Sequence, residues 1–130
     1  MRVPAGFSVV TPYLFVNGAD DYLGFLATAF GAREIGCSRA PDGRIANAQI
    51  EVFGVTLMVS EASAAFEASR AAFYLYVADA DAAMAQAEAA GAERIMEVAD
   101  MPYGDRQGGV RDPAGTIWWI SQRLTDAPYF

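Results

Sequence analysis

The chain has 130 residues, a formal net charge of −7 and a pI of about 4.4, and 54% of its residues are hydrophobic. This length supports one domain with a sizeable core but not two independent ones. The acidic charge argues against nucleic acids and acidic membrane surfaces as partners, because both are polyanions. It would mildly favour a cationic small molecule.

Cysteine usage and the N-terminal residues predict a cytoplasmic protein. Cys37 is the one cysteine, so an internal disulfide is excluded. Residues 1–7 lack the basic and apolar regions of a secretory signal, and no run approaches the ~20 apolar residues of a membrane span. We interpret Cys37 as a small buried residue rather than a nucleophile, because the chain contains no histidine to activate it.

The first half of the chain predicts a strand, a helix and three more strands. Alternation predicts a strand at Val10–Val16, and apolar residues at helical spacing from Tyr22 to Phe30 predict a helix that ends at Gly31. The next three strands are expected at Arg33–Arg39, Ile45–Phe53 and Val55–Ser60. A short connecting helix is expected at Glu61–Ala71 from its composition.

The second half repeats this order. Tyr74–Val77 matches Tyr13–Val16, which lies 61 positions earlier, and collinear matches at the same offset continue to Ser60 and Ser121. A strand at Ala72–Val77 leads to an alanine-rich helix, which Asp79 or Asp81 caps and Gly91 ends. The remaining strands are expected at Glu93–Val98, Gly108–Asp112 and Thr116–Gln122.

The repeat predicts one domain over 1–130, built from two tandem βαβββ modules. Module 1 is expected at about 8–60, the connecting helix at 61–71, module 2 at 72–123 and a C-terminal tail at 124–130. The fold class is α+β, with the strands forming a half-open curled mixed sheet and the helices on its convex side.

Strand alternation separates two faces of the sheet. The aliphatic set should lie under the helices: Leu14, Val16, Leu57, Val59, Leu75, Val77, Trp118 and Ile120. The opposite set mixes aromatic and hydroxyl side chains and includes Tyr13, Phe15, Met58, Ser60, Tyr74, Tyr76, Trp119 and Ser121. Such a mixture suits the wall of a ligand cavity. The polar residues Asn47, Gln49 and Glu51 face either this cavity or solvent.

Several motifs, in this order, resemble the vicinal oxygen chelate superfamily, which includes glyoxalase I, extradiol dioxygenases, fosfomycin-resistance enzymes and bleomycin-binding proteins. The motifs are Thr11–Leu14, Ala29–Ala32, Pro41–Arg44, Gly104–Arg106 and Val110–Gly115. The PhnB-like branch is the most similar. The resemblance implies two modules that form a half-open barrel, often in a homodimer.

The resemblance also implies metal ligands on the first and last strand of each module. Those positions fall near Thr11, Met58, Ala72 and Trp119, none of which is an ordinary ligand for a catalytic metal. A typical middle-strand histidine of the branch would fall near Asn47. We therefore expect no metal and no other cofactor. A carboxylate site using Glu51, Asp105 or Asp112 is the remaining alternative.

The polar loop Tyr103–Arg106 is the last candidate for ligand contact. Its aromatic, carboxylate and guanidinium groups could orient a ligand, or Asp105 and Arg106 could pair locally and fix the loop. The expected ligand-binding residues are thus Tyr13, Phe15, Asn47, Gln49, Met58, Tyr74, Tyr76, Tyr103, Asp105, Arg106 and Trp119, with no catalytic residue.

Three functions follow, and we favour the first. It is metal-independent binding of a small aromatic or apolar molecule, possibly a cation, in the manner of bleomycin-resistance proteins. The second is a glyoxalase-like lyase or isomerase with an atypical or absent metal, for which Glu51, Asp105 or a tyrosine would supply the base. The third is a dimeric scaffold without a ligand.

Overall fold

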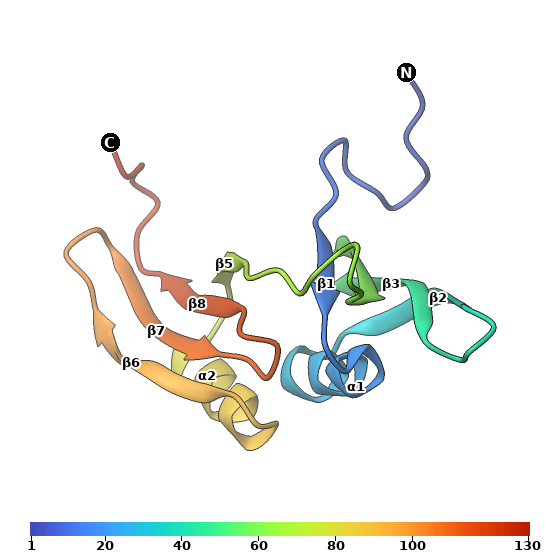
Figure 1. Ribbon diagram of the computed structural model, residues 1–130. Helices are drawn as coiled ribbons and strands as arrows, with labels where there is room; N and C mark the ends of the chain where they lie inside the picture. The colour runs from blue at the N-terminus through green and yellow to red at the C-terminus, as the bar shows by residue number, and fades with distance from the viewer. The chain divides into compact units, whose positions relative to one another are not determined.

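The two copies seen in the sequence fold as two units of the chain, Met1–Arg70 and Ala71–Phe130. The computed structural model describes all residues from 1 to 130 (Figure 1). Each unit contains one helix and a four-stranded mixed sheet, so the predicted α+β class and the two βαβββ modules are confirmed. Neither helix is long and apolar enough to cross a membrane.

The two sheets have the same strand order. Unit 1 comprises β1 (Tyr13–Val16), α1 (Ala19–Phe30), β2 (Arg33–Arg39), β3 (Ile45–Val52) and β4 (Val55–Glu61), and its sheet runs β1-β4-β3-β2. Unit 2 comprises β5 (Ala72–Tyr76), α2 (Ala80–Ala89), β6 (Glu93–Asp100), β7 (Asp105–Arg111) and β8 (Ile117–Arg123), and its sheet runs β5-β8-β7-β6. In each, the first strand is parallel to the last and the other pairs are antiparallel.

Each helix covers one face of its own sheet. In unit 1 the aliphatic side chains of Leu14, Val16 and Val59 are buried with Leu26 of α1. In unit 2, Val110, Trp118 and Ile120 are buried with Met84 of α2. We call the opposite side of each sheet its open face. The alternation seen in the sequence therefore separates the two faces correctly.

The last strand of each sheet also stabilises the start of the helix. Gly18 precedes α1 and offers no side-chain cap, so the Glu61 carboxylate accepts the backbone N–H groups of Gly18 and Ala19, each at 2.9 Å. In unit 2, Gln122 Oε1 accepts the N–H of Ala80 at 3.0 Å, and Asp79 accepts that of Ala82. These bonds satisfy amides that a helix cannot pair internally.

The expected connecting helix at 61–71 is wrong. Residues 62–71 contain no helix. Only about ten residues are available, which is short for a stable isolated helix. Tertiary contacts hold the segment instead: Phe66 packs on Phe15, and Ser69 Oγ accepts the Phe15 N–H at 3.4 Å.

Three smaller expectations also need correction. Strand β1 begins at Tyr13 rather than Val10, where its ladder with β4 starts. Strand β7 begins at Asp105 rather than Gly108, because Asp105 to Gln107 continue the ladder with β8. Cys37 is exposed rather than buried, because β2 is an edge strand with only Gly36 partly covered.

Candidate functional site

The open face of unit 1 carries a stack of three aromatic rings. Tyr13 and Phe15 on β1 lie with their ring centroids 4.6 Å apart and their planes 11° from parallel. Phe66, from the segment after β4, stacks on Phe15 at 5.4 Å. Tyr13 and Phe66 are exposed, so the stack presents ring surface to a ligand.

A hollow of about 460 Å³ adjoins this stack. Its lining residues are Tyr13, Phe15, Ala40, Arg44, Ile45, Ala46, Ser60, Glu61, Ser63 and Phe66. Ser60 donates to the carbonyl of Ala46 at 2.6 Å, so the Tyr13 hydroxyl donates to Ser60 Oγ at 2.7 Å. The Tyr13 oxygen therefore keeps its acceptor capacity for a ligand.

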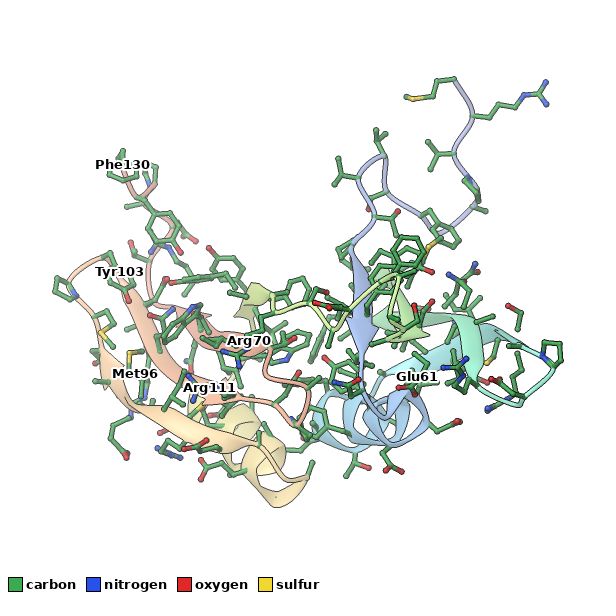
Figure 2. All side chains as sticks on the ribbon, in the orientation of Figure 1. Glu61, Arg70, Met96, Tyr103, Arg111 and Phe130 are labelled. Carbon is green, nitrogen blue, oxygen red and sulfur yellow. The ribbon has the colours of Figure 1, made fainter.

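The charged groups of this hollow already have partners. Arg44 pairs with Asp42 at 2.8 Å, and Glu61 accepts the two amides at the start of α1. Figure 2 shows Glu61 beside that helix start. The wall is therefore mainly aromatic and apolar, with weakly polar hydroxyl groups.

A second hollow of about 420 Å³ lies between the sheet of unit 1 and the segment before β1, residues 1–12, which we call the N-terminal arm. It is lined by Met1, Arg2, Val3, Pro4, Phe7, Ser8, Val9, Thr11, Gln49 and Met58. The buried Thr56 hydroxyl donates to the Gly6 carbonyl at 2.6 Å and holds the arm over the sheet. Met58 lines this second hollow, and its partner in the β1–β4 ladder is Tyr13, which lines the first. The two hollows therefore adjoin each other at this residue pair.

The open face of unit 2 is built around the carboxylate of Asp105, which is fully buried. Arg123 Nη1 donates to Asp105 Oδ1 at 2.9 Å, and the hydroxyls of Tyr74 and Tyr129 both donate to Oδ2. Three donors thus converge on one carboxylate, which is how a buried charge is accommodated.

This network changes the acidity of its members. Burial would raise the pKa of Asp105, but the bonds from Tyr74, Arg123 and Tyr129 outweigh it and hold the pKa below the ordinary value. Burial, and then the bond to Asp105, raise the pKa of Tyr74. The pKa of Tyr129, which lies among the Tyr76 hydroxyl, the Tyr74 hydroxyl and the Asp105 carboxylate, is raised as well. Both phenols consequently stay neutral donors beside an anion.

Trp119 lies across the middle of the same sheet. Its strand partners are Tyr74 on β5 and Gly109 on β7. A Cβ atom at Gly109 would stand 2.7 Å from Trp119 Cζ3, so only glycine leaves room for the indole in this position. Farther along, Gln107 donates to Ser121 at 2.7 Å and accepts the hydroxyl of Tyr103.

The predicted site residues fall into two groups and one outlier. Unit 1 brings Tyr13, Phe15, Asn47, Gln49 and Met58 to its open face, and unit 2 brings Tyr74, Tyr76, Asp105 and Trp119 to its own. Tyr103 joins the second group from the β6–β7 turn, at the end of the sheet where the tail to Phe130 also lies (Figure 2). Arg106 points away and pairs with Asp81 and Asp100 near the start of α2.

Asp105 and Arg106 do not pair with each other. As neighbours on β7 they face opposite sides of the sheet, and each has its own partner of opposite charge. The local pair considered for the loop is therefore wrong. Asp105 is instead paired with Arg123 on β8, and Arg106 with Asp81 on α2 and Asp100 on β6.

Three residues of the open faces are absent from the predicted set: Phe66, Tyr129 and Arg123. Phe66 and Tyr129 lie outside the strands, where alternation carries no information. One signal was available: each is a large aromatic residue shortly after the last strand of its module. Arg123 ends β8, and alternation from Ser121 would have placed it on the open face.

The residues at the four positions where the resemblance implies metal ligands do not fit a metal centre. Thr11, Met58, Ala72 and Trp119 offer a hydroxyl, a thioether, a methyl group and an indole, and none supplies imidazole or carboxylate. Nowhere in the chain do three or more acidic or cysteine side chains gather as they would around a metal ion. The carboxylates of Glu51, Asp105 and Asp112 form no such group.

Comparison with known proteins places the chain in a family. The family model described as Glyoxalase/Bleomycin resistance protein/Dioxygenase superfamily matches residues 7–120. An uncharacterised protein of Mycobacterium bovis is 30% identical over 128 residues. The match covers 90% of this chain and 84% of that protein.

Solved structures agree on the fold. TioX from Micromonospora sp. ML1 is 25% identical with a TM-score of 0.71, over 93% of this chain and all of that one. TnmS3, an antibiotic-binding protein from Streptomyces sp. CB03234, is 20% identical with a TM-score of 0.71, over 95% and 98% of the two chains. The chain belongs to the glyoxalase/bleomycin resistance protein/dioxygenase superfamily and has its α+β fold.

Proposed function

We propose that the protein binds a small, flat aromatic molecule without a metal, on the open face of unit 1. The observation that carries this proposal is the stack of Tyr13, Phe15 and Phe66 beside the hollow. A volume of about 460 Å³ lies within the roughly 300–1,000 Å³ of small-molecule pockets. The antibiotic-binding TnmS3, which has the same fold, gives further support.

A cationic aromatic guest would suit this site best. The faces of the rings are electron-rich, and a cation over such a face gains about 0.5–2 kcal/mol. The net charge of −7 adds a weak, non-specific attraction. The two acidic groups nearest the hollow, Asp42 and Glu61, are already engaged, so ring contacts should determine most of the affinity.

The two carboxylates that the lyase or isomerase alternative could use as a base are already engaged. Asp105 accepts bonds from three donors, and Glu51 pairs with Arg33. A general base must reach a substrate proton with an uncommitted lone pair. These contacts favour binding over catalysis. The expected homodimer stays a prediction.

Fluorescence titration with 9-aminoacridine, a flat cation, and with acridine at pH 8, where it is neutral, tests the proposal. The parent protein should bind both, with tighter binding of the cation. Phe66→Ala should weaken binding about tenfold, because it removes one ring of the stack. Phe130→Ala is the matched control, since Phe130 is fully exposed.

Trp119→Ala locates the site. It should leave binding unchanged, because the residues that line the hollow all belong to unit 1. If Trp119→Ala abolished binding while Phe66→Ala did not, the placement in unit 1 would be wrong. If neither dye bound the parent, the proposal of an aromatic-binding protein would fail.

A further inference from the structure

We propose that the open face of unit 2 is a second binding site, specific for a neutral phenol, and that Tyr129 of the chain's own tail occupies it. The aromatic hollow, by contrast, is lined only by residues of unit 1. All its residues belong to unit 2: Tyr74, Tyr76, Asp105, Arg123 and Tyr129.

The phenol group of Tyr129 is recognised at both its hydroxyl and its ring. The hydroxyl donates to Asp105 Oδ2 at 2.7 Å, and because its one hydrogen is used there, it accepts from the Tyr76 hydroxyl at 2.7 Å. The ring lies under the guanidinium of Arg123, with Cζ 4.1 Å from the ring centroid. An acceptor, a donor and a cation thus match the three features of a phenol.

Asp105 and Arg123, which receive the phenol, are also held by partners outside the tail. Arg123 Nη1 donates to Asp105 and, at 2.7 Å, to the carbonyl of Tyr103, and Tyr74 donates to the buried Asp105 carboxylate. These contacts come from strands and from the β6–β7 turn rather than from the tail. A site that is preorganised loses little freedom when a ligand enters.

The tail has no regular structure and is attached at a few points. Past β8 it is held by the Leu124 amide on Gly104, by Arg123 on the Ala127 carbonyl, and then by Tyr129. Tyr129 remains 43% exposed. A tethered group of this kind competes as if present at about millimolar concentration, so free phenols must displace it.

The site should also select the protonation state of its ligand. The Asp105 carboxylate carries a negative charge and would repel a phenolate, whereas it accepts a hydrogen bond from a neutral phenol. The raised pKa of Tyr129 agrees with this preference. Carboxylic acids, which are anionic at neutral pH, should be excluded for the same reason.

The test uses 19F NMR titration with 4-fluorophenol, and with fluorobenzene as the ligand without a hydroxyl. Tyr129→Ala in the full chain should bind 4-fluorophenol at least about tenfold more tightly than the parent, because the tethered competitor is gone. The same variant should bind fluorobenzene at least about tenfold more weakly than 4-fluorophenol, because a bond to the carboxylate is lost.

Further variants test whether the phenol binds on the open face of unit 2. Phe130→Ala should behave as the parent, because Phe130 is fully exposed. Adding Phe66→Ala to Tyr129→Ala should change nothing, whereas adding Tyr76→Phe should weaken binding several-fold without touching the buried carboxylate. The proposal is overturned if Tyr129→Ala binds 4-fluorophenol no better than the parent, or if 4-fluorophenol and fluorobenzene bind it equally.

Discussion

The two units share one backbone plan but use their open faces differently. Across the middle of the sheet, unit 1 places Tyr13, Met58 and Gln49 side by side, and unit 2 places Tyr74, Trp119 and Gly109. In unit 1 the ring surface adjoins a hollow. In unit 2 hydrogen-bonded polar groups occupy the face.

A few residues account for this difference. Ser60 and Ser121 pair with Phe15 and Tyr76 in the two parallel ladders, and two positions later unit 1 has Ala62 where unit 2 has Arg123. In unit 2 Arg123 pairs with the buried Asp105 carboxylate, and the Ala62 methyl group offers no such partner in unit 1. The change from Phe15 to Tyr76 adds the hydroxyl that Tyr129 uses.

Both units nevertheless bring an aromatic residue back from the segment after the last strand. Phe66 returns to Phe15 by stacking, and Tyr129 returns to Tyr76 by a hydrogen bond. In both units the segment after the last strand therefore packs against the first strand, through apolar contacts in unit 1 and through polar contacts in unit 2. A duplicated fold can thus keep its geometry while the chemistry of each copy diverges.

The largest expected effect on stability comes from the pair of the buried Asp105 and Arg123 in unit 2. Asp105→Asn should lower the free energy of unfolding by about 3 kcal/mol at pH 7, because it leaves the Arg123 guanidinium without its anion. Asp20→Asn removes a comparable but exposed pair with Arg39 in unit 1 and should have little effect. Urea denaturation of the two variants measures the contrast, and equal losses would contradict it.

Acid should reduce the difference in unfolding free energy between the parent and Asp105→Asn. The pKa of Asp105 is lowered in the folded chain, so its stabilisation is complete above the unfolded value of about 3.9 and is lost as the pH falls through the folded value. The gap in unfolding free energy between the parent and Asp105→Asn should therefore narrow below about pH 4. Repeating the urea series from pH 7 downward measures this, and a constant gap would show that the charge is not what stabilises the site.

The next-largest effect on stability tests how Trp119 is accommodated beside Gly109 in the sheet of unit 2. Gly109→Ala should cost about 1–3 kcal/mol of unfolding free energy, because its Cβ would stand 2.7 Å from the Trp119 ring. Gly36→Ala on β2 is the matched control, since a Cβ there meets nothing within 4 Å. Thermal unfolding followed by circular dichroism compares them. If the two substitutions were equivalent, the indole would not depend on Gly109 for its position.

Much of this fold could be predicted from the sequence, because its signals are local and repeated. Alternation and the repeat correctly placed Tyr13, Phe15, Tyr74 and Trp119 on the open faces. The partners of Asp105 could not be predicted in the same way. Arg123 is its neighbour only through the β7–β8 ladder, and Tyr129 reaches it from a tail without regular structure. Pairings of this kind depend on tertiary packing, which no single-strand pattern contains.

The smallest expected effect separates the helix starts of the two units. Glu61→Ala should cost about 1 kcal/mol of unfolding free energy, because two amides at the start of α1 lose their acceptor and Gly18 offers no side-chain substitute. Gln122→Ala should cost less, because it frees only the Ala80 amide while Asp79 still caps α2.

Glu61→Gln divides the effect in unit 1 into its two causes. An amide keeps one acceptor oxygen but loses the negative charge, whose interaction with the helix dipole is worth about 0.3–1 kcal/mol. Glu61→Gln should therefore fall between the parent and Glu61→Ala, and the gap from the parent should shrink in high salt. If Glu61→Gln matched the parent at every salt concentration, the hydrogen bonds alone would hold α1, and the two helix starts would differ only in their number of acceptors.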